Sequence, residues 1–197
     1  MVNNQIEFNE KYNNKEVTEI EIRRSRNFQG ELVIEDYSEL EKLNLRDIRS
    51  IDKVILKNLT QLQECTIWDC GTKELVIKNC PQIKKLNVRK NSLTSLECLA
   101  NLANLTKLDI AINPNLTSLS FLFNLRNLTE LEMKDNPKLD EILKHYKGDW
   151  RNWKGSQTNP KGSLYDIQSS KKVESDTSLK EESELATQIG IPPKGGN

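Results

Sequence analysis

Apolar residues recur along the chain in one spaced pattern, apolar-x-x-apolar-x-apolar. The pattern begins at Val17, Leu40, Leu62, Ile83, Leu105 and Leu128. These starts are separated by 23, 22, 21, 22 and 23 residues. In each copy the last two apolar positions alternate with polar residues, which predicts a short strand with one buried face. Because a strand returns after each interval, successive strands are expected to lie parallel and side by side.

The segments between these strands are of two kinds. In the first half of the chain, compact β-branched runs recur around Val33, Ile55 and Val76. These runs predict short strands on the opposite side of the array. In the second half, leucine occupies every third position from 96 to 102 and again from 119 to 125. That spacing favours a 3₁₀ or single helical turn.

Asparagine follows the strand by three residues in the later copies, at Asn91, Asn113 and Asn136. Its side chain can hydrogen-bond the backbone of a turn, and neighbouring copies can form a ladder. The run 83–93, IKKLNVRKNSL, fits the pattern LxxLxLxxNxL, and the chain therefore resembles the leucine-rich-repeat family, with short internalin-like repeats. The same position in the first three copies holds Ser25, Ile48 and Cys70, so irregular turns are expected there.

This resemblance implies an α/β fold. It is a leucine-rich-repeat solenoid with a parallel β-sheet on its concave face and short strands or 3₁₀ turns on its convex face. The chain is also similar to leucine-rich-repeat arrays of root-symbiotic fungi, where such arrays accompany kinase-like domains.

Four parts are expected along the chain. Residues 1–16 form an N-terminal cap that includes a short helix over Asn4–Tyr12, and residues 17–143 form the array of six units. Residues 144–154 bring three aromatic side chains together after the last strand, either as a C-terminal cap or as an aromatic ligand site. Residues 155–197 are rich in glycine and proline and are expected to be a disordered tail. A weak amphipathic stretch in the tail, from Ser178 to Ile189, either frays or folds on a partner.

Composition narrows the class of activity. The 197 residues hold 29 Lys and Arg against 29 Asp and Glu, and this balance argues against a general nucleic-acid or membrane-surface binder. The chain has no apolar run of the roughly 18 residues that a membrane helix needs, and its start lacks the features of a secretory signal. We therefore expect a cytoplasmic protein. No common catalytic motif is present, so we expect no enzyme and no cofactor.

The four cysteines do not suggest a metal site. Cys65, Cys70, Cys80 and Cys98 lack CxxC spacing, and the single histidine, His145, lies far along the chain. Cys65 and Cys80 align with core leucines of other copies, so we expect reduced, buried thiols. Four Asn-Leu-Thr sequons would permit glycosylation in a secreted chain, but we interpret them as products of the repeat. They begin at Asn58, Asn104, Asn115 and Asn127.

Side chains between the buried strand positions are expected to face the concave side in three columns. The first column is Glu19, Lys42, Glu64, Lys85, Lys107 and Glu130. The middle column is Glu21, Asn44, Thr66, Asn87, Asp109 and Glu132. The last column is Arg23, Arg46, Trp68, Arg89, Ala111 and Lys134. The first column predicts a solvated salt-bridge ladder.

The last column is the candidate binding stripe, because Trp68 is expected to be exposed in mid-sheet and because Arg and Trp are enriched at the energetic centres of interfaces. The alternative is that Trp68 lies over neighbouring arginine stems and only packs there. The expected binding residues are Arg23, Arg46, Trp68, Arg89, Lys134, Asn44, Asn87 and Asp109.

The sequence thus predicts a non-enzymatic, monomeric module that binds a protein or peptide on its concave face, and no small molecule, nucleic acid or membrane. Protein binding is an implication of the family resemblance. The alternative is a sensor or targeting fragment that regulates a separate signalling enzyme such as a kinase. Nucleic-acid binding through the arginines is a third class, which the neighbouring carboxylates disfavour.

Overall fold

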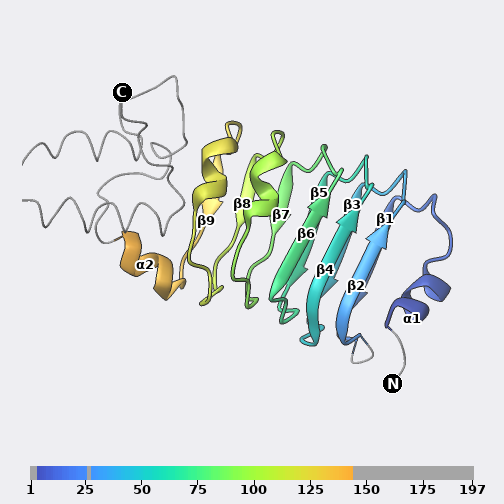
Figure 1. Cartoon of the computed structure of the whole chain (residues 1–197). Helices are drawn as coiled ribbons and strands as arrows, with labels where there is room; N and C mark the ends of the chain where they lie inside the picture. Colours follow the sequence, from blue (N-terminus) through green and yellow to red (C-terminus); the bar gives the residue numbers. More distant parts are fainter. Residues whose placement is uncertain (1–3, 26–27, 144–197) are drawn as a thin grey trace, which may run out of the picture.

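The chain winds as a parallel β-solenoid with one turn every 21 to 23 residues (Figure 1). The structure is a computed structural model, and it describes residues 4–25 and 28–143. The expected C-terminal cap (144–154) and tail (155–197) lie outside the described residues. No helix in the described ranges is long and apolar enough to cross a membrane.

Each copy of the repeat contributes one strand to a six-stranded parallel sheet, here called the large sheet, as the sequence predicts. Its strands, in spatial order, are β1 (Glu19–Arg23), β3 (Lys42–Arg46), β5 (Glu64–Trp68), β7 (Lys85–Asn87), β8 (Lys107–Asp109) and β9 (Glu130–Glu132). The strands pair without slippage, so equivalent residues of successive copies lie directly opposite one another.

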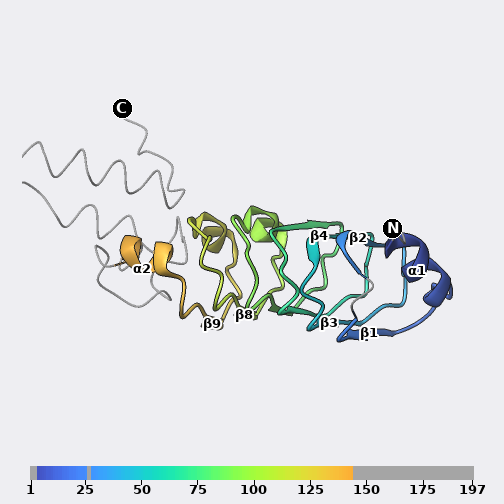
Figure 2. The same cartoon turned by 90° about the horizontal axis from the view of Figure 1, so that it is seen from below.

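The return segments form the second layer, which faces the large sheet (Figure 2). In the first half they form a three-stranded parallel sheet, the small sheet, of β2 (Gly30–Glu35), β4 (Ile51–Lys57) and β6 (Glu74–Lys78). In the second half they form two 3₁₀ helices, η1 (Glu97–Asn101) and η2 (Ser120–Asn124). Both predicted kinds of return segment are confirmed.

The core lies between the two layers and consists of inward-facing aliphatic and aromatic side chains. Cys65 and Cys80 are buried in it, as predicted, together with Cys70, whereas Cys98 is half-buried. All four are free thiols. Burial raises the pKa of Cys70 and of Cys98 to about 12, and it also raises the pKa of Cys65 and Cys80. These thiols are therefore protonated at neutral pH and act as small apolar groups.

Buried asparagines tie the later turns together, as the repeat pattern predicts. The Asn91 Oδ1 accepts hydrogen bonds from the backbone N–H of Cys70 and of Thr72, each at 3.1 Å. Its Nδ2 donates to the carbonyls of Ile67 at 2.6 Å and Val88 at 2.9 Å. The amide thus bonds two successive turns at once. Equivalent bonds are made by Asn113 and Asn136.

The early turns differ from the later ones, as expected. All six turns after the large-sheet strands contain a residue with positive φ directly before the asparagine position. The second and third turns add another, at Arg49 (φ 50°) and Gly71 (φ 76°). A Cβ on Gly71 would lie 2.7 Å from the Arg49 carbonyl oxygen. In the third turn the Cys70 thiol donates to the carbonyls of Leu45 and Trp68, both at 3.4 Å, where later turns use an asparagine amide.

Short helices lie at both ends of the described array (Figure 1). The expected N-terminal helix is present as α1 (Asn4–Lys11). Its Phe8 is buried against the rings of Tyr12 and Tyr37, with centroids 5.0 and 6.2 Å away. At the other end, α2 (Pro137–Leu143) begins directly after Asn136 and was not predicted. Proline suits the first position of a helix because its missing N–H needs no partner there.

Candidate functional site

The outward side of the large sheet, here called the large-sheet face, carries the three predicted columns. Strand pairing places the first and middle columns in register across β1 to β9. Backbone bonds extend the last column past the short strands, since the N–H of Asp69 donates to the carbonyl of Arg89 and that of Lys90 to Ala111. An open hollow of about 490 Å³ lies over β5, β7, β8 and β9, between the first and middle columns.

The first column forms lateral ion pairs, as predicted. Lys85 Nζ lies 2.6 Å from a Glu64 carboxylate oxygen, and Lys107 Nζ lies 2.7 Å from one of Glu130. The hydrogen bond from Lys85 lowers the pKa of Glu64. These side chains are about half exposed, so each pair adds little to stability.

The middle column has a structural role at the ends of the short strands. The Asn87 Oδ1 accepts the backbone N–H of Arg89 at 3.0 Å, and the Asp109 Oδ1 accepts that of Ala111 at 3.0 Å. Each of these half-buried side chains has a second polar atom that can still form hydrogen bonds on the face. Burial, together with Glu132 opposite, raises the pKa of the Asp109 carboxyl. The folded protein therefore favours the protonated form of Asp109 more than the unfolded chain does.

Asp109→Asn is expected to stabilise the protein near pH 7. A raised pKa means that the folded state holds the Asp109 proton more tightly than the unfolded state does. The resulting stability is complete below the ordinary aspartate pKa of about 3.9 and is lost as pH rises through the folded-state value. The asparagine avoids that loss while keeping an Oδ1 acceptor, and the gain is below about 1 kcal/mol because solvent screens a half-exposed group. Thermal melts near pH 7 and about pH 3 measure it.

Asn87→Asp is the matched control, because Asn87 lies directly opposite Asp109. A second carboxylate there is expected to lower stability near pH 7, since like charges on paired strands repel. A gain from Asp109→Asn that is the same at both pH values would contradict this explanation.

Trp68 is half-buried, which corrects the expectation that it is exposed in mid-sheet. The Lys90 Nζ lies 5.6 Å from its ring centroid, within the range of a cation–π contact. The predicted alternative was packing over arginine stems, but the cation that approaches the ring is Lys90, from the following turn. As a half-buried residue, Trp68 keeps part of its surface accessible to solvent.

The cations of the last column differ in their partners. Arg23 lies 2.5 Å from Glu21, and Lys134 lies 3.6 Å from Glu132. Arg46, on β3, and Arg89, just after β7, flank Trp68 and form no ion pair among the described residues. A 3.5 Å bond joins Arg46 Nη2 to the Asn44 Oδ1, and the buried Arg46 Nε has no acceptor in the described structure. The stripe therefore holds two arginines, next to Trp68 in the last column, that form no ion pair among the described residues, although Arg89 attracts the nearby Asp109 carboxylate.

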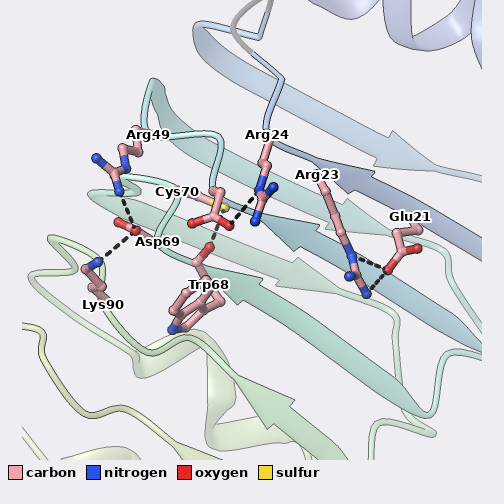
Figure 3. A network of polar contacts seen from close by, with 9 residues as sticks. Glu21, Arg23, Arg24, Arg49, Trp68, Asp69, Cys70 and Lys90 are labelled. Atoms are coloured by element: carbon pink, nitrogen blue, oxygen red, sulfur yellow. Dashed lines mark hydrogen bonds and ion pairs between the residues drawn. The ribbon is translucent and has the colours of Figure 1, made fainter.

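The carboxylates at the adjoining turn were not predicted from the sequence. Asp69 is 8% exposed and is held by Arg49 at 3.3 Å and by Lys90 at 2.8 Å (Figure 3). Arg24 lies 4.0 Å from Asp47 in the preceding turn. The signal was present in the sequence, because Arg24, Asp47, Asp69 and Lys90 each follow the last column directly and together carry both signs of charge. Their cations form ion pairs within the protein, whereas Arg46 and Arg89 form none among the described residues.

The sequon residues join neighbouring turns. Asn104 donates to the Pro81 carbonyl at 3.0 Å, and Asn127 donates to the Ala103 carbonyl at 2.9 Å. The Thr106 hydroxyl donates to the Lys84 carbonyl at 3.0 Å. These contacts agree with the interpretation of Asn-Leu-Thr as part of the repeat.

The fold and the face together define a parallel β-solenoid with a polar, in-register outer sheet. The sequence matches no protein-family model, and comparison with curated protein sequences finds no match.

Proposed function

We propose that the chain is a leucine-rich-repeat type solenoid that binds a protein or peptide on the large-sheet face and catalyses no reaction. The repeat pattern and the buried asparagine ladder support the family assignment. A reducing compartment such as the cytoplasm suits four free cysteines.

The observation that carries the binding proposal is the last column around Trp68. The half-buried Trp68 lies between two arginines that form no ion pair among the described residues, on a sheet face that no described element covers. Such groups gain most when a partner removes them from water, which is why Trp and Arg dominate interface energetics. A purely structural surface would be expected to pair these charges, as the first column does.

Site-specific photo-crosslinking tests the proposal. A photoreactive amino acid is placed at Thr66, in the middle of β5, and in a matched variant at Val76, in the middle of β6. Both positions are half-buried and outward-facing, but they lie on opposite sheets. In lysate of the source cells we expect a discrete protein adduct from position 66 and none from position 76. Equal labelling at both positions, or none at either, would contradict the proposal.

Trp68→Ala is expected to weaken binding of that crosslinked partner by ~2 kcal/mol or more, as hot-spot truncations do. Its cost to stability should be smaller than that of a core truncation, because Trp68 is only half-buried. Titration calorimetry with the purified partner measures the affinity, and urea unfolding measures the stability. If Trp68→Ala lowers stability but leaves the affinity of folded molecules unchanged, Trp68 is a packing residue.

A further inference from the structure

The chemistry of the large-sheet face specifies what kind of segment it accepts. Arg46 lies directly opposite Trp68 in the sheet register, and the backbone bond from Asp69 to Arg89 places Arg89 on the other side of the ring. Adjacent strands are ~4.8 Å apart, so the two arginine Cα atoms are ~10 Å apart with Trp68 midway. Their long side chains can both reach a group lying above the indole. We call Arg46, Trp68 and Arg89 the arginine clamp.

The arginines of the clamp form no ion pair among the described residues, and one donor of Arg46 has no acceptor there. Of the nearby acids, Asp69 is bound by Arg49 and Lys90, and Asp47 by Arg24. Asp109 lies close enough to attract Arg89 but forms no ion pair with it. The buried Arg46 Nε is a donor with no partner among the described atoms. A buried donor without an acceptor is unfavourable, and a carboxylate can bond Nε and Nη of one guanidinium side by side.

We propose that the segment bound on this face is an acidic peptide, one of whose carboxylates binds between Arg46 and Arg89 over the Trp68 ring. This inference rests on the proposed function and adds the chemistry of the partner. The carboxylate supplies the missing acceptor for Arg46 and neutralises both guanidinium groups. The methylene groups of its side chain lie on the accessible part of the indole.

The rest of the face favours a peptide over a nucleic acid. Asp109 lies opposite Glu132 on β8 and β9, and the only cation paired with the Glu132 carboxylate among the described residues is Lys134, at 3.6 Å. A polyanionic backbone that continued across these strands would meet these acids, and like charges repel it. A peptide can place its acidic residues at the clamp alone.

Selection from a random peptide library tests the inference on the full-length protein. Peptides of about 10 residues suffice, since six strands ~4.8 Å apart are spanned by an extended chain at ~3.3 Å per residue. We expect the selected peptides to share an Asp or Glu. Their affinity is then measured for the double variant Arg46→Gln, Arg89→Gln and for a matched double variant, Lys78→Gln, Arg126→Gln. The matched variant removes two exposed cations that form no ion pair among the described residues and lie on the return side of the array.

Acidic peptides are expected to lose about tenfold or more in affinity for the clamp variant and little for the matched variant. Equal losses in both variants, or selected peptides without acidic residues, would overturn the inference. So would a single-stranded RNA of similar length that binds more tightly than the peptides and depends on the clamp. Thermal melts of both variants exclude unfolding as the cause.

A third variant, Thr66→Tyr, separates this inference from the proposed function. It obstructs the centre of the large-sheet face without changing charge. Non-acidic peptides that lose affinity for Thr66→Tyr would leave the proposed function standing while overturning the clamp. If no selected peptide is sensitive to Thr66→Tyr or to the clamp variant, both proposals fail.

Discussion

Asn91→Ala is expected to lower the free energy of unfolding by about 3 to 5 kcal/mol, because it leaves several buried backbone groups without partners. The amide accepts from two N–H groups and donates to the carbonyls of Ile67, Val88 and Arg89. Asn91 is 5% exposed, so water replaces these bonds poorly. Urea unfolding followed by far-ultraviolet circular dichroism measures the loss.

Asn104→Ala is the matched control for this prediction. Asn104 is exposed and donates one hydrogen bond, to the Pro81 carbonyl. Its removal is expected to cost no more than about 1 kcal/mol. Similar losses for the two variants would mean that the buried ladder contributes no more than an exposed contact.

The second large effect is expected from Leu86→Ala, which removes a side chain that is 2% exposed in the middle of the array. Leu86 lies between Cys65 on β5 and Leu108 on β8 in the sheet register. The loss in stability has two parts: the favourable free energy of burying the removed methyl groups is lost, and a cavity is left in the core. Such truncations cost about 2 to 5 kcal/mol. The same urea titration measures this loss.

Leu131→Ala tests whether the effect follows burial rather than residue type. Leu131 occupies the same column on β9 but is half-buried. Because Leu131 is only half-buried, its neighbours and solvent can fill the space that the truncation leaves. We therefore expect about half the loss of stability of Leu86→Ala or less. An equal loss at Leu131 would show that the last turn is as tightly packed as the middle of the array.

The repeat period made most of the fold predictable. A strand with one buried face has a local signature, and its regular return fixes parallel pairing and register without further information. Val33, Ile55 and Val76 were correctly assigned to a second strand in the early turns because β-branched residues cluster there. Asn91 and its two counterparts were correctly assigned to turns, since few other side chains can bond backbone donors and acceptors together.

Side-chain partners were less predictable because they depend on three-dimensional detail beyond the column pattern. Lys90 approaches from the next turn and lies near both the Trp68 ring and the Asp69 carboxylate, a contact that the column pattern does not contain. The missing acceptor at Arg46 is visible only once its neighbours have been placed. Helix α2 was missed because its leucine spacing also fits the repeat.

The side chain of Gln5 covers part of an exposed sheet edge to which another copy of the chain could pair. Its amide donates to the Val33 carbonyl and accepts the Val33 N–H, each at 2.8 Å, and so occupies backbone groups on β2, the edge strand of the small sheet. An open edge strand is a template for another chain, and end-to-end joining of solenoids would repeat without closing. By blocking that edge at Val33, one glutamine opposes filament growth from this end.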